Sequence, residues 1–130
     1  MGDKAPAPLR VLFIGNSQVN CVCDIAAIVT TLSRSAPASV QPIETDEVVV
    51  GGAGLEMLWK HGMARKRIEA GSWDWVVANE LIYSYGATTA RFREYARKFN
   101  ERAAKAGARM MYFATGEIES ARLKPGAMYE

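Results

Sequence analysis

The clearest hydrophobic run of the chain is residues 11–14, Val-Leu-Phe-Ile, where no polar residue interrupts the apolar side chains. A run of this kind is typical of a strand that is buried on both faces of a parallel sheet. Shorter apolar segments recur along the chain between turn-forming residues. We expect strands at residues 9–14, within residues 40–50 in two pieces, at residues 75–78 and at residues 110–114.

Apolar residues at helical spacing separate these strands. A first helix is expected to begin after Asp24, whose side chain suits the N-cap position, and to end near residues 35–37. Its apolar face consists of Ile25, Ile28, Val29 and Leu32. A second helix is expected to start near Leu55 and to break or bend at Gly62, because glycine destabilises helix interiors.

The third predicted helix is the most regular of the three. Thr88 or Thr89 caps its start, Gly107 stops it, and its apolar stripe consists of Phe92, Tyr95, Ala96, Phe99 and Ala103. Strands that alternate with helices imply right-handed crossovers and a parallel sheet between two helical layers. The predicted fold is therefore an α/β three-layer sandwich with a parallel sheet. Residues 1–8 are expected to form a flexible leader and residues 9–130 a single domain.

Composition narrows the classes of partner. A chain of 130 residues, of which 49% are hydrophobic, is large enough for one domain with its own core. The formal net charge is +2 and the two signs are interleaved, so no nucleic-acid partner is expected. The sequence has neither an apolar run of roughly 20 residues nor the apolar core of a signal peptide. We therefore expect no membrane association and a cytoplasmic location.

The cysteine and histidine content argues against a metal site. Cys21 and Cys23 are the two cysteines, and a disulfide between residues so close in sequence closes only a small strained ring. Free thiols, buried or half-buried, are the simpler interpretation. A thiolate metal site normally needs four ligands, and His61 is the lone histidine. No metal and no cofactor is expected.

Residues useful for acyl transfer follow three successive predicted strands. They are Ser17 after the first, Gly52 or Gly54 after the second, and Asn79 after the third. Because the carboxyl ends of parallel strands share one edge of the sheet, we expect these residues to converge. Attack by a serine hydroxyl on an ester carbonyl develops negative charge on oxygen, which needs donors about 3 Å away. The backbone amides of Ser17 and a glycine, with the Asn79 carboxamide, are suitable donors.

Each of these features also has a plainer interpretation. Residues 15–17 suit an ordinary strand-to-helix turn, and Asn79 with Glu80 has the same status. The glycine-rich residues 51–54 lack the spacing of a nucleotide-binding loop. The tryptophans are most simply packing residues at the core or its rim, although one near the site can stack on a sugar ring: Trp59, Trp73 and Trp75. Only the joint pattern favours an enzyme.

Four segments in the right order resemble the SGNH, or GDSL-type, hydrolases, in the variant whose nucleophile motif reads Gly-Asn-Ser. They are residues 14–17 (Ile-Gly-Asn-Ser), 50–55 (Val-Gly-Gly-Ala-Gly-Leu), 73–80 (Trp-Asp-Trp-Val-Val-Ala-Asn-Glu) and 107–113 (Gly-Ala-Arg-Met-Met-Tyr-Phe). The resemblance implies a serine esterase that acts on small, acetyl-like esters, with carbohydrate esters as candidates, through an acyl-serine intermediate. It also implies that Ser17 is the nucleophile and that Ser17, Gly52 and Asn79 form the oxyanion hole.

The chain departs from this family at the general base. Family members carry a histidine three residues after an aspartate near the carboxyl terminus, but no histidine follows His61 here. His61, Glu117 and Glu119 are candidate substitutes, and each is more simply a solvated side chain. Because a serine hydroxyl without a base is a weak nucleophile, a non-catalytic binding module is the alternative function.

The fourth predicted strand is the second departure. The resemblance implies a flavodoxin-like sheet, because family sheets often have the order 2-1-3-4-5. This sequence stops where family members continue to a fifth strand and the histidine loop. Without that strand, residues 110–114 are an apolar edge, which is unfavourable in water. We therefore expect either a truncated sequence or an edge that a second copy of the chain covers in a homodimer.

Overall fold

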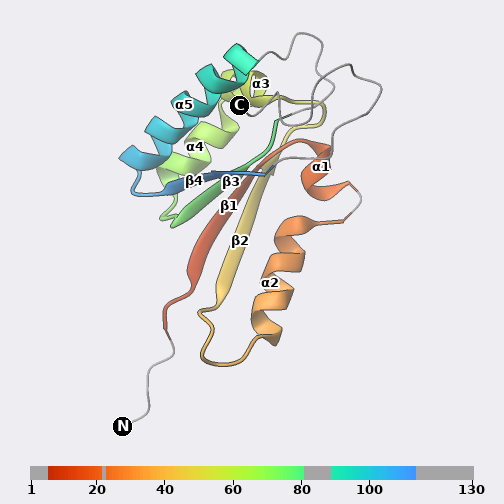
Figure 1. Ribbon diagram of the computed structural model, residues 1–130, viewed down its shortest axis with the longest axis vertical. Coiled ribbons are helices and arrows are strands. Elements are labelled where there is room, and N and C mark those ends of the chain that lie inside the picture. The colour runs from red at the N-terminus through yellow and green to blue at the C-terminus, as the bar shows by residue number, and fades with distance from the viewer. Residues whose placement is uncertain (1–5, 22, 81–88, 114–130) are drawn as a thin grey trace.

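A parallel sheet forms the centre of the computed structural model, which describes residues 6–21, 23–80 and 89–113. Its four strands have the order β2-β1-β3-β4, as predicted for this part of the chain. The strands are β1 (Leu9–Gly15), β2 (Ile43–Val49), β3 (Trp75–Ala78) and β4 (Arg109–Tyr112). All of the strand pairs are parallel. The carboxyl ends of the strands therefore lie at one edge of the sheet (Figure 1).

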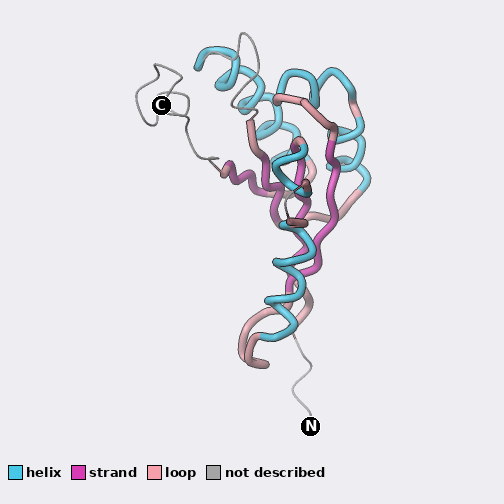
Figure 2. Tube along the Cα trace, turned by 90° about the vertical axis from the view of Figure 1, so that its right-hand side faces the viewer, coloured by secondary structure: helices cyan, strands magenta, loops and turns pink. Residues whose placement is uncertain are grey.

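Helices cover both faces of this sheet and complete the three predicted layers. On one side lie α1 (Ser17–Asn20) and α2 (Ile25–Ser35). On the other side lie α3 (Leu55–His61), α4 (Met63–Ala70) and α5 (Thr89–Lys105) (Figure 1). Figure 2 shows that α2 runs along the lower half of the strands, so that α1 stands near their carboxyl ends.

Strand β1 lies between β2 and β3 in the sheet. Its residues 11–15 are buried, as the unbroken apolar run predicts. It pairs with β2 from Leu9 opposite Ile43 to Gly15 opposite Val49, and with β3 on its other side. Strand β3 has the predicted bounds. This pairing brings the ends of β1, β2 and β3 together, which is the arrangement that the candidate site requires.

The larger core lies between the sheet and α3, α4 and α5. Leu12 and Ile14 of β1 point into it, and Phe99 of α5 is fully buried there. The predicted stripe of α5 is confirmed: four of its members are buried and Ala96 is half-buried. Gly107 follows the end of α5 with φ +80°, a conformation that favours glycine.

The smaller core lies between the sheet and α1 and α2, around Val11, Phe13 and Val77. Asp24 caps α2 as predicted, since its Oδ1 accepts a hydrogen bond from the Ala27 N–H at 2.8 Å. The predicted apolar face of α2 is only partly covered. Its Ile28 and Leu32 side chains are 43% and 65% exposed.

Three details of the predicted elements need correction. Strand β2 is one strand and not two, because its pairing with β1 continues through the polar residues 44–47. The break expected at Gly62 is, by contrast, confirmed: this glycine, with φ +86°, divides the second helix into α3 and α4. The short helix α1 was not predicted at all. Strand β4 begins at Arg109, and position 114 of its predicted range lies outside the described residues, as do Thr88 and residues 1–5 of the expected leader.

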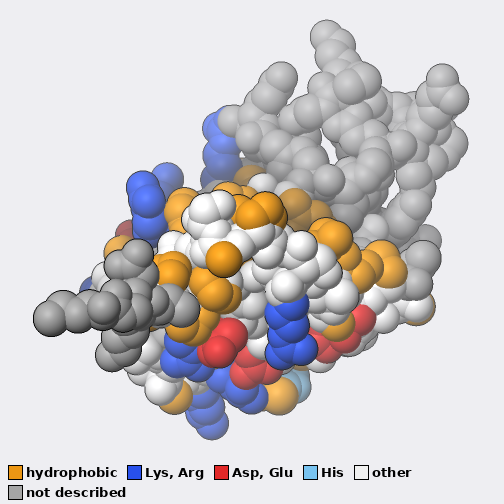
Figure 3. Space-filling model, turned by 90° about the horizontal axis from the view of Figure 1, so that it is seen from below, with side chains coloured by type: hydrophobic (Ala, Val, Ile, Leu, Met, Phe, Trp, Pro, Cys, Tyr) orange, Lys and Arg blue, Asp and Glu red, His pale blue; other side chains and the backbone are white. Residues whose placement is uncertain are grey.

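The surface matches the interleaved charges of the sequence. On the face seen in Figure 3, basic and acidic side chains are interspersed and hydrophobic side chains lie between them. Among the described residues, no helix has both the length and the apolar character needed to cross a bilayer.

Candidate active site

The first predicted site residue, Ser17, stands directly after the buried end of β1. Gly15 is the last residue of β1, Asn16 is the N-cap of α1, and Ser17 is the first residue of that helix. The Ser17 side chain is half-buried, and its hydroxyl makes no hydrogen bond to another described residue. Its backbone N–H belongs to the first turn of a helix, where amides have no intrahelical partner. Both groups of Ser17 are therefore available for chemistry.

Asn16 connects three segments at this edge of the sheet. Its Nδ2 donates to the Ala53 carbonyl at 3.0 Å, which fixes the loop after β2. Its Oδ1 accepts from the Gln18 N–H at 3.0 Å and from Nδ2 of Asn79 at 3.3 Å. The side chain is fully buried, so each of these bonds replaces one to water. The sequence interpretation gave Asn16 no role of its own, although asparagine directly before a helix is a strong N-cap signal.

The third predicted site residue, Asn79, follows β3 and is also fully buried. Its Nδ2 donates to Oε1 of Gln18 at 3.0 Å as well as to Asn16. Its Oδ1 lies against Gly15, where an added Cβ would come within 2.0 Å of it. That oxygen has no hydrogen-bond partner among the described residues. The close approach explains why β1 ends in glycine, and the structure joins Asn79 directly to the helix that begins at Ser17.

The second predicted site residue, Gly52, lies in the turn between β2 and α3. It has φ +71° and is exposed, and nothing lies within 4 Å of an added Cβ. Within the described part of the chain, its N–H donates no hydrogen bond. The turn is held instead at its flanks, where the Val50 N–H donates to the Gly15 carbonyl at 2.9 Å and Ala53 contacts Asn16. Gly52 is thus tied to the site through its neighbours.

Gln18 is a site residue that the sequence interpretation missed. Its side-chain oxygen accepts the hydrogen bond of the Asn79 amide at the 3.0 Å distance that suits an oxyanion. For Asn79 to stabilise a reacting ester, the substrate oxygen must take the place of this oxygen. The sequence does not reveal this contact, because a glutamine after a turn is usually exposed. The contact depends on how α1 packs near the end of β3.

The candidate bases do not gather at this site. His61 is exposed at the last residue of α3, whereas the site lies near Leu55 at the first residue. Six residues of helix place them about 9 Å apart along the axis. The plainer interpretation of His61 as a solvated residue is therefore supported. Glu117 and Glu119 lie outside the described residues.

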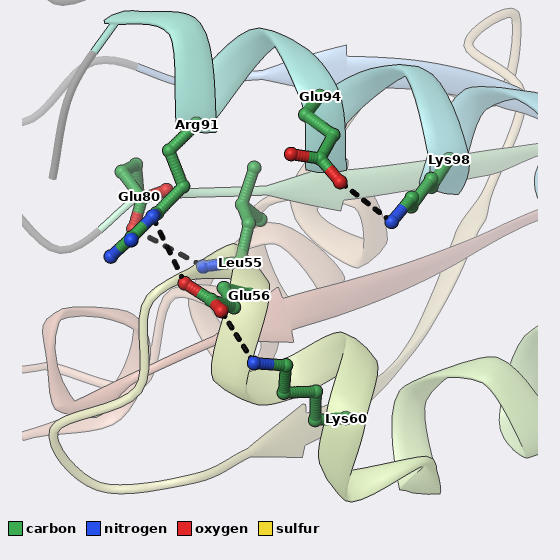
Figure 4. Close-up of polar contacts among 7 residues, drawn as sticks. All are labelled: Leu55, Glu56, Lys60, Glu80, Arg91, Glu94 and Lys98. Atoms are coloured by element: carbon green, nitrogen blue, oxygen red, sulfur yellow. Dashed lines mark hydrogen bonds and ion pairs between the residues drawn. The ribbon is translucent and has the colours of Figure 1, made fainter.

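Ionised groups surround the start of α3. Glu56 forms ion pairs with Lys60 at 2.5 Å and with Nε of Arg91 at 3.1 Å (Figure 4). The hydrogen bond from Lys60 lowers the pKa of the Glu56 carboxyl, and the same bond raises the pKa of Lys60. Both side chains are consequently charged at neutral pH and make poor proton acceptors or donors for catalysis.

The cysteines correct one expectation. Cys21 and Cys23 are free, as predicted, but both are exposed and not buried. No group of three or more histidine, cysteine or acidic side chains with metal-binding geometry occurs among residues 6–21, 23–80 and 89–113. Grooves of about 360 and 370 Å³ lie along α2 and include none of Ser17, Gly52 and Asn79.

Comparison with known proteins adds one match. A solved structure described as "a putative SGNH hydrolase from Slackia heliotrinireducens" superimposes with a TM-score of 0.62 at 23% sequence identity. The alignment covers 88% of this chain and 60% of that one. This chain has an SGNH-like fold. The order and direction of the strands agree with that assignment, and so does the placement of helices on both faces.

The SGNH-like chain spans 60% of the length of the solved structure that it matches. A scan against protein-family models and a search of curated proteins gave no match. The likeness therefore concerns the fold, and the chemistry has to be argued from the residues at the carboxyl ends of the strands.

Proposed function

We propose that this chain carries the nucleophile and oxyanion hole of an SGNH-type serine ester hydrolase. The observation that carries the proposal is that hydrogen bonds connect the ends of three strands. Asn16, which directly precedes Ser17, bonds to Ala53 after β2 and to Asn79 after β3. Residues far apart in sequence meet in this way only where the fold places them. The SGNH-like fold of the chain supports the same conclusion.

The proposed reaction proceeds through an acyl-serine intermediate. Oγ of Ser17 attacks the ester carbonyl carbon, a base takes the hydroxyl proton, and the carbonyl oxygen becomes negatively charged. The N–H groups of Ser17 and Gly52 and the Asn79 amide stabilise that oxygen. The bond to the alcohol then breaks, the alcohol leaves with a proton, and water hydrolyses the acyl-serine to release the acid. No metal or cofactor takes part in these steps.

The proposal needs a general base, and His61 does not fill that role. Either a carboxylate after β4, Glu117 or Glu119, accepts the proton, or a chain that continues past Glu130 into an Asp-x-x-His segment supplies a histidine. The length of the natural reading frame distinguishes these two sources. As substrates we propose small, acetyl-like esters, including those of carbohydrates, which rests on the resemblance of the motifs alone.

A non-catalytic binding module is the second candidate function. One observation favours it: the Asn79 amide, one donor of the proposed oxyanion hole, already donates to Oε1 of Gln18. A protein of this kind keeps the fold and a pocket but does not turn over an ester.

Hydrolysis of p-nitrophenyl acetate by the purified chain and by Ser17→Ala separates the two functions. We expect Ser17→Ala to lose at least about 100-fold in kcat, because the nucleophile is removed. The exposed Ser72, which lies in the connection between α4 and β3, gives the matched control. Ser72→Ala is expected to keep the rate of the unaltered chain. Equal rates for the unaltered chain and Ser17→Ala would remove Ser17 from the mechanism and leave the binding module.

We further propose that a second copy of the chain covers the outer edge of β4 in a homodimer. The strand is last in the described sheet, and its Met111 side chain is 50% exposed. Such edges pair readily with other strands. Light scattering at high protein concentration tests this assembly, and a strict monomer argues against it.

A further inference from the structure

Two consecutive residues at the end of β3 point to opposite faces of the sheet. Asn79 continues the side of Val77, toward α1, and reaches Asn16 and Gln18. Glu80 continues the side of Ala78, toward α3. This alternation is the ordinary geometry of extended backbone. One residue therefore belongs to the candidate oxyanion hole, and the next belongs to the element behind the Gly52 turn.

Glu80 is a buried carboxylate, with only 5% of its surface exposed. Its Oε1 accepts a hydrogen bond from the Leu55 N–H at 3.1 Å (Figure 4). An added Cβ on Gly54 would lie 2.3 Å from the same oxygen, so the chain is glycine where the carboxylate comes close. The contact therefore depends on two residues: Glu80 supplies the buried acceptor, and Gly54, which has no Cβ, leaves room for it.

The carboxylate takes the place of a missing helix cap. Gly54 is the N-cap of α3 and has no side chain to accept from the first amides of the helix. Such amides need an acceptor from elsewhere. Because Leu55 is the first residue of α3, the bond from Glu80 fixes where the helix begins and where the preceding turn ends.

The turn before this bond contains Gly52, and no contact of Gly52 itself fixes the conformation of that turn. An added Cβ at Gly52 meets nothing within 4 Å. The direction of its N–H is therefore set by the contacts on either side, which are Ala53 to Asn16 and Leu55 to Glu80. An oxyanion donor must be fixed before the reaction to be effective.

We propose that Glu80 is a positioning residue of the esterase site, which holds the start of α3 so that the Gly52 N–H faces the reacting oxygen. This inference rests on the proposed function. It assigns Glu80 an effect through the Gly52 turn and not through contact with substrate. The property that this role requires is the reach of its oxygen to the Leu55 N–H.

Two substitutions separate reach from charge. Glu80→Gln keeps the length and an acceptor oxygen but removes the charge, whereas Glu80→Asp keeps the charge but is too short by one methylene. With p-nitrophenyl acetate we expect Glu80→Gln to keep most of its kcat and Glu80→Asp to lose about 10- to 100-fold, with KM changed less than about threefold in both. Rates are compared at a temperature at which circular dichroism shows each variant to be folded.

Glu56→Ala is the matched control, because Glu56 is in the first turn of α3 and pairs with Lys60 and Arg91 instead of the turn. It is expected to keep kcat. The proposal is overturned if Glu80→Asp is as active as Glu80→Gln, which would show that the reach of the side chain does not matter. It is overturned equally if Glu80→Asp is the more active of the two, which would show that charge matters, or if Glu56→Ala loses as much as Glu80→Asp, which would show a general effect on α3.

A second readout keeps this test independent of the proposed function. In amide NMR spectra, the Gly52 signal is assigned by its loss in Gly52→Ala. We expect that signal to shift in Glu80→Asp and to stay in place in Glu80→Gln. An unchanged Gly52 signal in Glu80→Asp contradicts the positioning role whether or not the chain hydrolyses esters. Equal rates for the unaltered chain and Ser17→Ala, with the expected NMR shift, instead reject the esterase and leave the contact between Glu80 and the turn.

Discussion

The face of the sheet beneath α3, α4 and α5 buries 16 apolar residues, whereas the face beneath α1 and α2 buries five, counted among the described residues. Three helices interdigitate on the first face. On the second, α2 packs along β2 and leaves Ile28 and Leu32 exposed. Aromatic packing follows the same division, since Trp59 and Phe99 meet edge to face at 5.1 Å in the larger core. The difference teaches that one face supplies most of the buried apolar packing, while the other carries Ser17, the proposed nucleophile.

Charged contacts add to the well-packed face. Arg67 of α4 pairs with Asp46 of β2, and Arg102 of α5 pairs with Glu69 of α4. All four side chains are at least one-third exposed, so these pairs contribute little to the free energy of unfolding. The asymmetry of the molecule is therefore expected to come from buried apolar area, which substitutions on the two faces can test.

The largest effect is expected from Phe99→Ala in the larger core. Phe99 is fully buried, so its removal leaves a cavity and should cost about 3–5 kcal/mol of unfolding free energy. Leu32→Ala on α2 is the matched control, because that side chain is 65% exposed and should cost less than about 0.5 kcal/mol. Urea denaturation followed by circular dichroism measures both. Similar costs would mean that the two faces contribute equally to stability.

The same contrast explains what the sequence could predict. The stripe of α5 was predictable because a wide apolar surface faces it, and β1 and β3 were predictable from unbroken apolar runs. The partial burial of the apolar face of α2 was not predictable. Periodicity shows which side of a helix is apolar, but it does not show how much of that side another element covers. Ile28 has the right spacing for a core and yet is exposed.

The candidate site shows a similar limit. The convergence of Ser17, Gly52 and Asn79 on one sheet edge follows from parallel topology, which the alternation of elements predicts. The contacts of Asn16 and Gln18 depend on how α1 packs. A helix of four residues is too short for its apolar periodicity to be recognised in the sequence. Glu80 stood in the motif without a role, because its partner is the backbone N–H of Leu55 and backbone partners leave no trace in a sequence.

An intermediate effect is expected from Asn16→Ala, at the junction of the two faces. The change leaves the Ala53 carbonyl, the Gln18 N–H and one Asn79 N–H without their partner, and should cost about 2–4 kcal/mol. Asn20→Ala is the control, because the exposed Asn20 has one bond to Glu47 and should cost less than about 1 kcal/mol. Urea denaturation again gives both values. If Asn16→Ala unfolds no more easily than Asn20→Ala, Asn16 does not connect the three strand ends.

The smallest effect is a pH dependence within the larger core. The Tyr112 hydroxyl donates to the Ala96 carbonyl at 2.8 Å, and burial raises the pKa of Tyr112 well above its usual range. In the unfolded chain the group ionises near about pH 10, whereas in the folded chain it stays protonated to higher pH. The unfolded state therefore binds fewer protons above that pH, so the stability contributed by Tyr112 is complete below it and falls as pH rises further.

Tyr112→Phe isolates this contribution, because it removes the ionisable group and keeps the edge-to-face contact with Phe92 at 5.7 Å. At neutral pH the variant should be less stable by about 1 kcal/mol, the usual loss for one hydrogen bond. Between pH 7 and about pH 11 that difference should shrink by up to about 1.4 kcal/mol, since only the unaltered chain loses stability through Tyr112. Denaturation of both proteins at pH 7 and at pH 11 measures the change. A difference that stays constant over this range would show that Tyr112 ionises in the folded chain as easily as in the unfolded one, and that the core beneath α5 does not exclude water there.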